Sequence, residues 1–347
     1  MPAWWRRLFV ALALALGGHA AFAAQGTPAL VAFYVPWEPT ALASLKAHAG
    51  SLDVFAPMWA SLVSTKGEVR WESDPEAHAA LAAAPRRPKV MPVVSNAHDD
   101  IWDVAAAQAV IGDPRAAEAF AEALAARARA EGFAGYVMDF ENLAPAGVAA
   151  YPALVARLRD RLHADGRQLW VTALLSTDPA TEQRLLASAD AVVLMAYDQC
   201  WAASTPGPIA DDAWLSGNLA AKLAGADPRR FVAALASYGY DWPAGRKAQV
   251  VSVSEALRLA AKSGAAIEHA PGSNAHFSYR GTDGPHQVWF ADGADFARQR
   301  RLASGFGVKA VGLWRMGLED PALWTAKPPA QAPTPSGPSA ACAPLPR

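Results

Sequence analysis

The stretch GYVMDFENL, residues 135–143, is an apolar run that ends in two acids, Asp139 and Glu141. Side chains alternate along a β-strand, so Val137, Asp139 and Glu141 would share one face, and the large apolar side chains between them would share the other. A buried carboxylate is costly unless it is paired or functional. The stretch therefore predicts a buried strand with reactive acids at its carboxyl end. The alternative is structural: Glu141 would cap the following helix, and Asp139 would pair with an arginine.

The same apolar character recurs in seven other short runs. They are LVAFYV from Leu30, LDVFAPM from Leu52, KVMPVVS from Lys89, LWVTALL from Leu169, AVVLMAY from Ala191, FVAALASY from Phe231 and AVGLW from Ala310. Helix-like segments separate most of them: Asp113 and Asp178 each precede a proline at the first helical position, and Ser252 with Glu255 indicates a capping box. Apolar strands that alternate with helices are typical of parallel strands covered by helices. Eight such units predict an α/β fold, a single-domain (β/α)8 TIM barrel.

An open, doubly wound parallel sheet is the alternative fold. No G-x-G-x-x-G or G-x-x-x-x-G-K-[ST] loop follows an early strand, which disfavours both that fold and a nucleotide ligand. One interval breaks the rhythm of strands and helices: AHFSYRGTDGPHQVWFAD, residues 275–292, alternates, turns at Gly and Asp, and alternates again. We expect a small β-hairpin here, inserted between strands 7 and 8 over the mouth of the barrel.

The first 23 residues differ in composition from the rest. Arg6 and Arg7 precede an apolar run, and small residues follow it up to Ala23. This layout is typical of a cleavable signal peptide, and the apolar run is too short to span a bilayer. We expect a secreted or periplasmic protein, cleaved after Ala23 and not inserted in the membrane afterwards. An uncleaved anchor is the alternative.

The other boundaries follow from composition and cysteine content. Residues 27–326 would form the barrel, and the Pro-, Ala- and Ser-rich residues 327–347 would form a disordered tail. An export signal permits disulfides, but two cysteines do not make a framework. We therefore expect Cys200 and Cys342 to be free thiols.

Aromatic and acidic side chains gather where the predicted strands end. Tyr197 and Asp198 end the sixth strand in LMAYDQCW, and Tyr238, Tyr240 and Asp241 follow the seventh in SYGYDW. Five tryptophans lie at or near these carboxyl ends: Trp37, Trp59, Trp201, Trp242 and Trp314. Each one alone is better explained as a core residue, but a group of indole faces suits the stacking of sugar rings. With two carboxylates beside them, they indicate glycoside hydrolysis.

The motif GYVMDFE, with LMAYD and GLW further along the chain, resembles the family 18 glycoside hydrolases, the chitinase-like barrels. MAYDQCWAASTPGPIADDAW, SYGYDW and LWRMGLEDPALW are similar to the bacterial branch often fused to polysaccharide deacetylase and glycosyltransferase modules. The resemblance spans essentially Ala32 to Trp324. It implies a hydrolase of β-linked N-acetylglucosamine (GlcNAc) polymers, such as chitin, poly-GlcNAc or peptidoglycan. It also implies a retaining mechanism in which the acetamido group of the substrate is the nucleophile.

The resemblance implies a role for each catalytic residue. Glu141 would protonate the glycosidic oxygen, Asp139 would stabilise the oxazolinium ion, and Tyr197 would hydrogen-bond the acetamido group. Asp198 would contact the sugar, and Trp314 would form the floor of that subsite. Since Glu141 must be protonated when it acts, burial or a second carboxylate should raise its pKa. The other residues expected to bind substrate are Tyr34, Trp37, Trp59, Asn96, Asn142, Trp201, Tyr238, Tyr240 and Trp242.

The sequence departs from the fuller family pattern at Ala134 and Val137, where acids are expected. Val137 precedes Asp139 on the same face, so Asp139 would lack a carboxylate with which to share a proton. This departure motivates a rival function, a carbohydrate-binding protein without strong catalysis that serves polysaccharide export or adhesion. The retained Asp139 and Glu141 argue against the rival. A third hypothesis is peptidoglycan remodelling of the spore-cortex type, which uses the same chemistry.

Other kinds of site and partner find less support. NAHDDIWD, residues 96–103, holds one histidine and three acids, but no second histidine lies at ligand spacing, and such acids suit a helix start. We expect Asn96 or Asp99 to reach substrate there, and no metal or cofactor. No G-x-S-x-G elbow indicates a serine hydrolase. The 31 basic and 32 acidic residues balance to a net charge of −1, so nucleic acid is a poor partner, and we expect a monomer.

Overall fold

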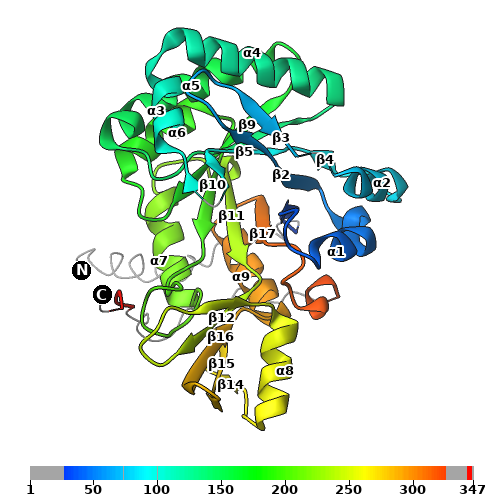
Figure 1. The fold of residues 1–347 in the computed structure, drawn as a ribbon, viewed down its shortest axis with the longest axis vertical. Coiled ribbons are helices and arrows are strands. Elements are labelled where there is room, and N and C mark those ends of the chain that lie inside the picture. Colours follow the sequence, from blue (N-terminus) through cyan, green and yellow to red (C-terminus); the bar gives the residue numbers. More distant parts are fainter. Residues whose placement is uncertain (1–26, 73, 100, 326–341, 346–347) are drawn as a thin grey trace, which may run out of the picture.

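Eight parallel strands close into a barrel in the computed structural model, which describes residues 27–72, 74–99, 101–325 and 342–345 (Figure 1). In chain order they are β1 (Ala29–Tyr34), β2 (Val54–Leu62), β5 (Val93–Ser95), β8 (Gly135–Asp139), β9 (Gln168–Leu174), β10 (Ala191–Ala196), β11 (Phe231–Ala236) and β17 (Ala310–Trp314). Each strand pairs with the next, and β17 pairs with β1 to close the ring. The predicted (β/α)8 barrel is confirmed. Two short strands, β3 (Val69–Trp71) and β4 (Lys89–Val90), pair with β2.

Side-chain alternation separates the barrel interior from the layer beneath the helices. On β8, Val137 packs inside the barrel, while Tyr136 and Met138 pack outside against the helices. All three side chains are fully buried. The interior cluster also includes Val31, Phe33, Val54, Ala56, Met91, Val93, Trp170, Val193, Val232 and Ala234. The inward face of β8 therefore leads from an apolar interior to the acids at its carboxyl end.

Helices surround the barrel on the outside (Figure 1). They are α1 (Ala41–His48), α2 (Pro75–Ala83), α3 (Val104–Gly112), α4 (Pro114–Glu131), α5 (Pro145–His163), α6 (Pro179–Ser188), α7 (Asp212–Leu223) and α9 (Gly293–Gly305), whereas α8 (Val253–Ser263) lies at the lower end of Figure 1, away from the barrel. Asp113, Asp178 and Ser252 each accept a hydrogen bond from a backbone N–H in the first turn of α4, α6 and α8, as predicted. These caps satisfy N–H groups that have no partner within the helix.

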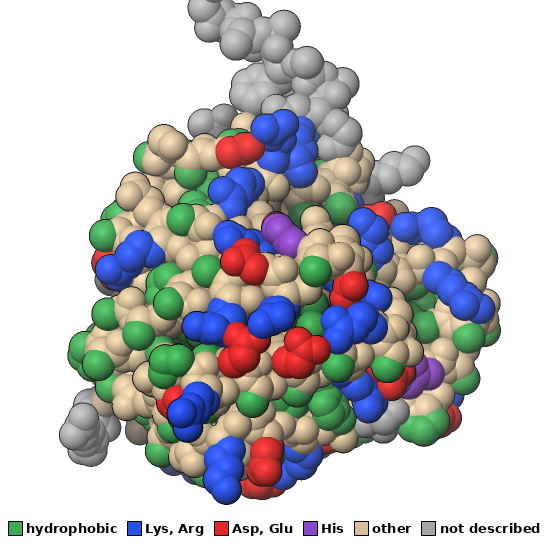
Figure 2. Space-filling view, turned by 90° about the horizontal axis from the view of Figure 1, so that it is seen from above, with side chains coloured by type: hydrophobic (Ala, Val, Ile, Leu, Met, Phe, Trp, Pro, Cys, Tyr) green, Lys and Arg blue, Asp and Glu red, His purple; other side chains and the backbone are tan. Residues whose placement is uncertain are grey.

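The surface over α4 carries acidic and basic side chains side by side. Figure 2 shows this end of the molecule, where Lys and Arg alternate with Asp and Glu. Glu118 of α4 pairs with Arg157 and Arg161 of α5. Such exposed pairs contribute little to stability, and their alternation gives this face no strong field of one sign.

The insertion between β11 and β17 is larger than the predicted hairpin. The hairpin itself is confirmed as β15 (Ala275–Gly281) and β16 (Gly284–Phe290). It belongs to a five-stranded antiparallel sheet that also contains β12 (Gly239–Pro243), β13 (Gln249–Val251) and β14 (Glu268–His269), with α8 packed against it. Only Ser237 and Tyr238 separate β12 from β11, so the sequence shows no clear break between the two strands.

Gly135 begins β8, directly beside Gln168 of β9. A Cβ atom here would lie 1.9 Å from the carbonyl oxygen of Gln168, and φ is 154°. Only glycine fits both the contact and the dihedral angle. The first residue of the stretch that decides the fold is therefore fixed by strand packing.

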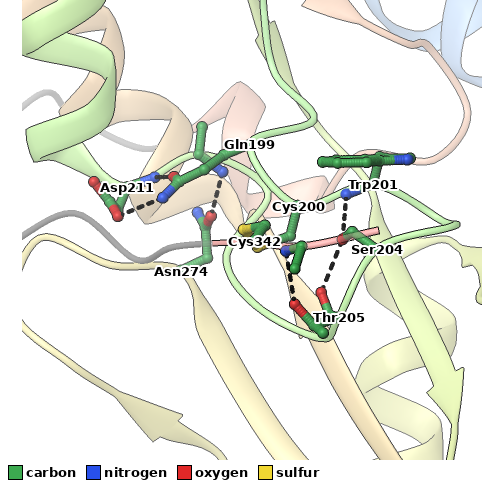
Figure 3. The surroundings of a disulfide bond; sticks show 10 residues. Gln199, Cys200, Trp201, Ser204, Thr205, Asp211, Asn274 and Cys342 are labelled. Atoms are coloured by element: carbon green, nitrogen blue, oxygen red, sulfur yellow. Dashed lines mark hydrogen bonds between the residues drawn. A yellow bond between two sulfur atoms is a disulfide. The ribbon is translucent and has the colours of Figure 1, made fainter. Parts of the chain in front are cut away.

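The end of the chain corrects two expectations. Cys200 and Cys342 form a disulfide, so the prediction of free thiols is wrong (Figure 3). Two cysteines separated by 142 positions give no pairing signal in the sequence. Residues 342–345 are also held by hydrogen bonds, including one of 2.7 Å from Thr205 N to Ala343 O. This part of the predicted disordered tail is therefore docked on the loop after β10.

Two other expectations fall outside the described residues. The predicted signal peptide, residues 1–23, is one of them, and residues 327–341 and 346–347 of the predicted tail are the other. Within the ranges that are described, none of the helices combines the length and the apolar character needed to cross a bilayer.

Candidate active site

A cavity of about 280 Å³ lies at the carboxyl ends of the barrel strands. Parallel barrels collect functional side chains at this end. Five of the residues predicted for the site line the cavity: Trp37, Asp139, Glu141, Tyr197 and Trp314. The structure therefore brings together both acids of the GYVMDFENL stretch and three aromatic residues from three other strand ends.

Glu141 reaches the cavity from the loop directly after β8. The buried Asn96 fixes its backbone: Glu141 N donates to Asn96 Oδ1 at 2.9 Å, and Asn96 Nδ2 donates to Glu141 O at 3.1 Å. Among the described residues, none hydrogen-bonds the Glu141 carboxyl itself. The N-cap residue of α5 is Ala144 and no side chain caps this helix, so Glu141 does not cap it. Burial raises the pKa of Glu141 to about 7, and the nearby charges of Asp139 and Asp198 add to the rise.

This combination suits a proton donor. A carboxyl group that stays protonated near neutral pH, and that has no internal partner, is free to hydrogen-bond a ligand in the cavity. The rise in the pKa of Glu141 is the one that its expected role requires.

Asp139 lies deeper than Glu141, with 7% of its surface exposed. The hydroxyl of Thr172 on β9 donates to Asp139 Oδ1 at 2.7 Å. Burial raises the pKa of Asp139, and the hydrogen bond from Thr172 opposes the rise. The alternative in which Asp139 pairs with an arginine is absent from the described part of the chain, since its hydrogen-bond partner there is this neutral hydroxyl.

Tyr197 and Trp314 form an aromatic wall of the cavity. Their rings stack with centroids 5.8 Å apart and planes within 6°, and Phe33 packs edge-on against Trp314 with centroids 5.7 Å apart. Burial raises the pKa of Tyr197 well above its usual range, so the phenol keeps its proton and remains a hydrogen-bond donor. A flat apolar face beside a hydroxyl donor matches the two sides of a sugar ring.

Asp198 follows Tyr197 in a left-handed conformation, with φ 61°. Its Oδ1 accepts hydrogen bonds from the hydroxyls of Tyr238 and Tyr240, the latter at 3.1 Å. Burial raises the pKa of Asp198, and these two bonds oppose the rise. The tyrosines therefore fix a carboxylate whose charge in turn raises the pKa of Glu141.

Comparison with known proteins agrees with this geometry. Residues 30–319 match the sequence model of the family described as "Glycosyl hydrolases family 18". The chain belongs to this family. The resemblance of GYVMDFE and LMAYD to the family is thereby confirmed.

Named relatives of this family 18 protein include chitinases and spore enzymes. The crystal structure of a chitinase from Chromobacterium violaceum ATCC 12472 superposes with a TM-score of 0.78 at 25% identity, covering 86% of this chain and 97% of that one. The Bacillus cereus spore cortex-lytic enzyme SleL gives a TM-score of 0.78 at 21% identity, with 86% and 73% covered. The "Cortical fragment-lytic enzyme" of Bacillus subtilis (strain 168) is 25% identical over 253 residues, which are 68% of this chain. The chain spans 48% and 58% of the lengths of two curated B. subtilis relatives.

A short hairpin borders the cavity of this family 18 protein. Its strands are β6 (Ala97–His98) and β7 (Ile101–Trp102). Ile101 and Trp102 line the cavity, yet they are 56% and 37% exposed. Large apolar side chains left exposed at a cavity mark a surface for a ligand.

The acids of residues 96–103 hold this hairpin in place. Arg70 donates two hydrogen bonds of 3.2 Å to Asp99, and His98 lies between Asp99 and Asp103 at 3.0 and 3.2 Å. Asp103 caps α3, as an acid at a helix start should. Among the residues described, which exclude position 100, no group of three His, Cys, Asp or Glu residues could hold a metal ion.

Three aromatic residues predicted to bind substrate are packed away from the cavity. Tyr34 and Trp59 are buried between barrel and helices, where Tyr34 donates to Asp74 and Trp59 stacks on His78. Trp242 is buried where the insertion sheet meets the barrel mouth. Each lies near a strand end in the sequence, but its side chain is committed to packing and does not line the cavity.

Other predicted residues stand behind the cavity or beside it. Asn96 fixes the Glu141 backbone, and Tyr238 and Tyr240 fix Asp198, so these three act through other residues. Trp201 is half-buried beside the disulfide loop (Figure 3). Asn142 is exposed, with φ 56°.

Several cavity residues are not among those predicted from the sequence. Thr172 is the only polar side chain in LWVTALL, and extending the alternation used for β8 to that strand would have placed it inside the barrel mouth. Ile101 and Trp102 belong to a strand of two residues, which is too short for a periodic signal. The apolar floor is formed by Phe33, Met58, Val93, Val193, Met195 and Ala234.

Proposed function

We propose that this protein is exported from the cytoplasm and hydrolyses a polysaccharide that contains β-linked GlcNAc. The carrying observation is that Glu141, whose carboxyl has a raised pKa, shares one cavity with the buried Asp139. Membership of glycosyl hydrolase family 18 supports hydrolysis of glycosidic bonds. The stacked Tyr197 and Trp314 support a sugar as the ligand.

In the proposed mechanism, the acetamido oxygen of the substrate attacks the anomeric carbon. Glu141 donates its proton to the glycosidic oxygen as that bond breaks, and the leaving sugar departs as an alcohol. The oxazolinium ion that forms is positively charged, and the Asp139 carboxylate stabilises it while Tyr197 hydrogen-bonds the acetamido group. Glu141, now ionised, takes a proton from water, which attacks the anomeric carbon. Two inversions at that carbon retain its configuration.

Two observations support export. Residues 1–23 have the layout of a signal peptide. Cys200 and Cys342 are joined in a disulfide, and disulfides persist mainly in oxidising compartments. A polymer such as chitin or peptidoglycan lies outside the cytoplasm, where an exported hydrolase meets it.

A glycan panel tests the function directly. Chitin oligomers, poly-β-1,6-GlcNAc and peptidoglycan are incubated with the protein, and products are identified by mass spectrometry. We expect new reducing ends on at least one glycan. Glu141→Gln should keep the melting temperature of the wild type and lower kcat about 100- to 10,000-fold, because the general acid is removed. Undiminished hydrolysis by this variant would exclude Glu141 as the acid.

The rival function rests on Val137, which stands where the family pattern has an acid. A carbohydrate-binding protein should bind one of these glycans tightly and release no new reducing ends from any of them. Calorimetry on the same panel measures binding, and the mass-spectrometric assay reports products. Tight binding without products supports the binding function, whereas products support the hydrolase.

A further inference from the structure

Thr172 occupies a position beside Asp139 that no predicted role covers. The two residues lie on neighbouring parallel strands, because Val137 of β8 is in register with Trp170 of β9, and each strand continues two residues toward the cavity. The Thr172 hydroxyl lies 2.7 Å from Asp139 Oδ1 and 3.3 Å from the carbonyl oxygen of Met138. Thr172 also lines the cavity.

The position two residues before Asp139 is closed to a polar partner. Val137 is fully buried in the interior cluster, in register with Val93 on one side and Trp170 on the other. All three side chains belong to the apolar cluster inside the barrel. Asp139 therefore takes its hydrogen bond from the side, through β9, and not from below along its own strand.

We propose that Thr172 is the positioning residue of Asp139. It takes the place of the carboxylate that is expected at position 137, where this chain has Val137. The inference rests on the proposed glycosidase function. A hydroxyl both donates and accepts. When Asp139 is ionised, Thr172 donates to it at 2.7 Å. When Asp139 is protonated, its O–H donates to Thr172, and the Thr172 proton turns to the Met138 carbonyl at 3.3 Å.

This arrangement keeps Asp139 oriented through both charge states of the reaction. The titratable groups that interact with Asp139 are Glu141 beyond the same strand, Tyr197 after β10, and Tyr151 of α5, while Asp198 acts on Glu141 and Tyr197. Both tyrosines have pKa values raised by burial, so they remain neutral. Thr172 is thus the neutral donor that favours the Asp139 carboxylate, the form that stabilises a cation.

The test compares Thr172→Val with Thr172→Ser. Valine keeps the shape and removes the hydroxyl, and a hydrogen bond to a charged group accounts for about 10- to 100-fold in kcat. We expect that loss in kcat with KM within about twofold, because a residue that acts only through Asp139 does not change how the ground state of the substrate is bound. The acidic limb of the kcat–pH profile should move to higher pH, since losing the donor raises the pKa of Asp139. Thr172→Ser should restore the wild-type profile.

A second readout does not need turnover. In the Glu141→Gln background, the Asp139 carboxyl is followed by 13C NMR over pH, with Asp139→Asn to assign its resonance. Thr172→Val should raise the Asp139 titration midpoint, and Thr172→Ala serves in its place if the valine variant does not fold. An unchanged midpoint and acidic limb in the variant overturn the proposal. If the wild type cleaves no glycan, the proposed function fails, while the NMR titration still decides the role of Thr172.

Discussion

Glu141 and Asp139 differ in depth and in partners, and their protonation follows from this. Glu141 has a free carboxyl near two other acids, whereas Asp139 is deeper and accepts a hydrogen bond from Thr172. Glu141 therefore holds its proton near neutral pH, whereas the hydrogen bond from Thr172 favours the ionised form of Asp139. This division matches an acid that gives up a proton above a carboxylate that meets a cation.

We expect kcat to fall as the pH rises through the pKa of Glu141, about 7. The sign follows from the role: the acid acts when protonated, and above its pKa the proton is lost. An ordinary exposed glutamate would lose activity more than two pH units lower. Stopped assays from about pH 4 to 9 on an active GlcNAc oligomer give the profile. A basic limb near pH 4 to 5 would contradict a desolvated Glu141.

We also expect Val137→Asp to weaken the fold and leave the site no better. Its carboxyl would lie between Val93 and Trp170 with no donor, at a cost of roughly 3 to 5 kcal/mol in the free energy of unfolding. Val137→Asn, with the same shape and no charge, is the matched control and should cost less. Urea unfolding measures both. A stable and faster Val137→Asp enzyme would show that the site lacked only a carboxylate.

The β6–β7 hairpin shows how an element is built by charges and used through its apolar face. Arg70, Asp99, His98 and Asp103 bind one another, while Ile101 and Trp102 face the cavity. Asp99 and Asp103 therefore hold the hairpin in place, and Ile101 and Trp102 are the residues available to contact a ligand.

Trp102→Ala tests that use. Loss of one stacking indole costs about 1 to 2 kcal/mol of binding, so KM should rise roughly 5- to 30-fold while kcat changes little. Leu257→Ala on α8 removes an apolar side chain of similar exposure, 42%, outside the residues that line the cavity, and should leave KM unchanged. Equal kinetics of the two variants would remove the hairpin from the substrate site. Steady-state kinetics on the preferred glycan decide this.

At the scale of the whole molecule, the end of the chain is tied to the barrel mouth. Besides the disulfide, Leu345 N donates to Ala203 O at 2.8 Å, and Ser204 pairs with Pro344. The loop that receives these contacts follows β10 and includes Asp198. Residues distant in sequence thus order one side of the active site.

Cys342→Ser should lower Tm by roughly 5 to 15 °C, because a bridge spanning 142 positions restricts the unfolded chain by about 2 to 5 kcal/mol. Reductant should lower Tm of the wild type by a similar amount and leave the variant unaffected. Differential scanning fluorimetry with and without reductant measures both effects. A wild type insensitive to reductant, with the thiols shown to be free, would contradict the bridge.

The sequence by itself determined the barrel and the two acids. Eight apolar runs, most of them separated by capped helices, admit few arrangements, and alternation along residues 135–141 places Asp139 and Glu141 on the inward face without tertiary information. The tertiary structure decided which aromatic residues reach the cavity. Trp37 and Tyr34 lie near the end of the same strand, yet Trp37 lines the cavity, as Trp314 does, while Tyr34 packs beneath the helices. It also decided the partners of those groups: Thr172 beside Asp139, Trp102 at the mouth, and Cys342 on Cys200. These contacts join residues that are far apart in the chain, and a local sequence pattern does not predict which distant residues come together.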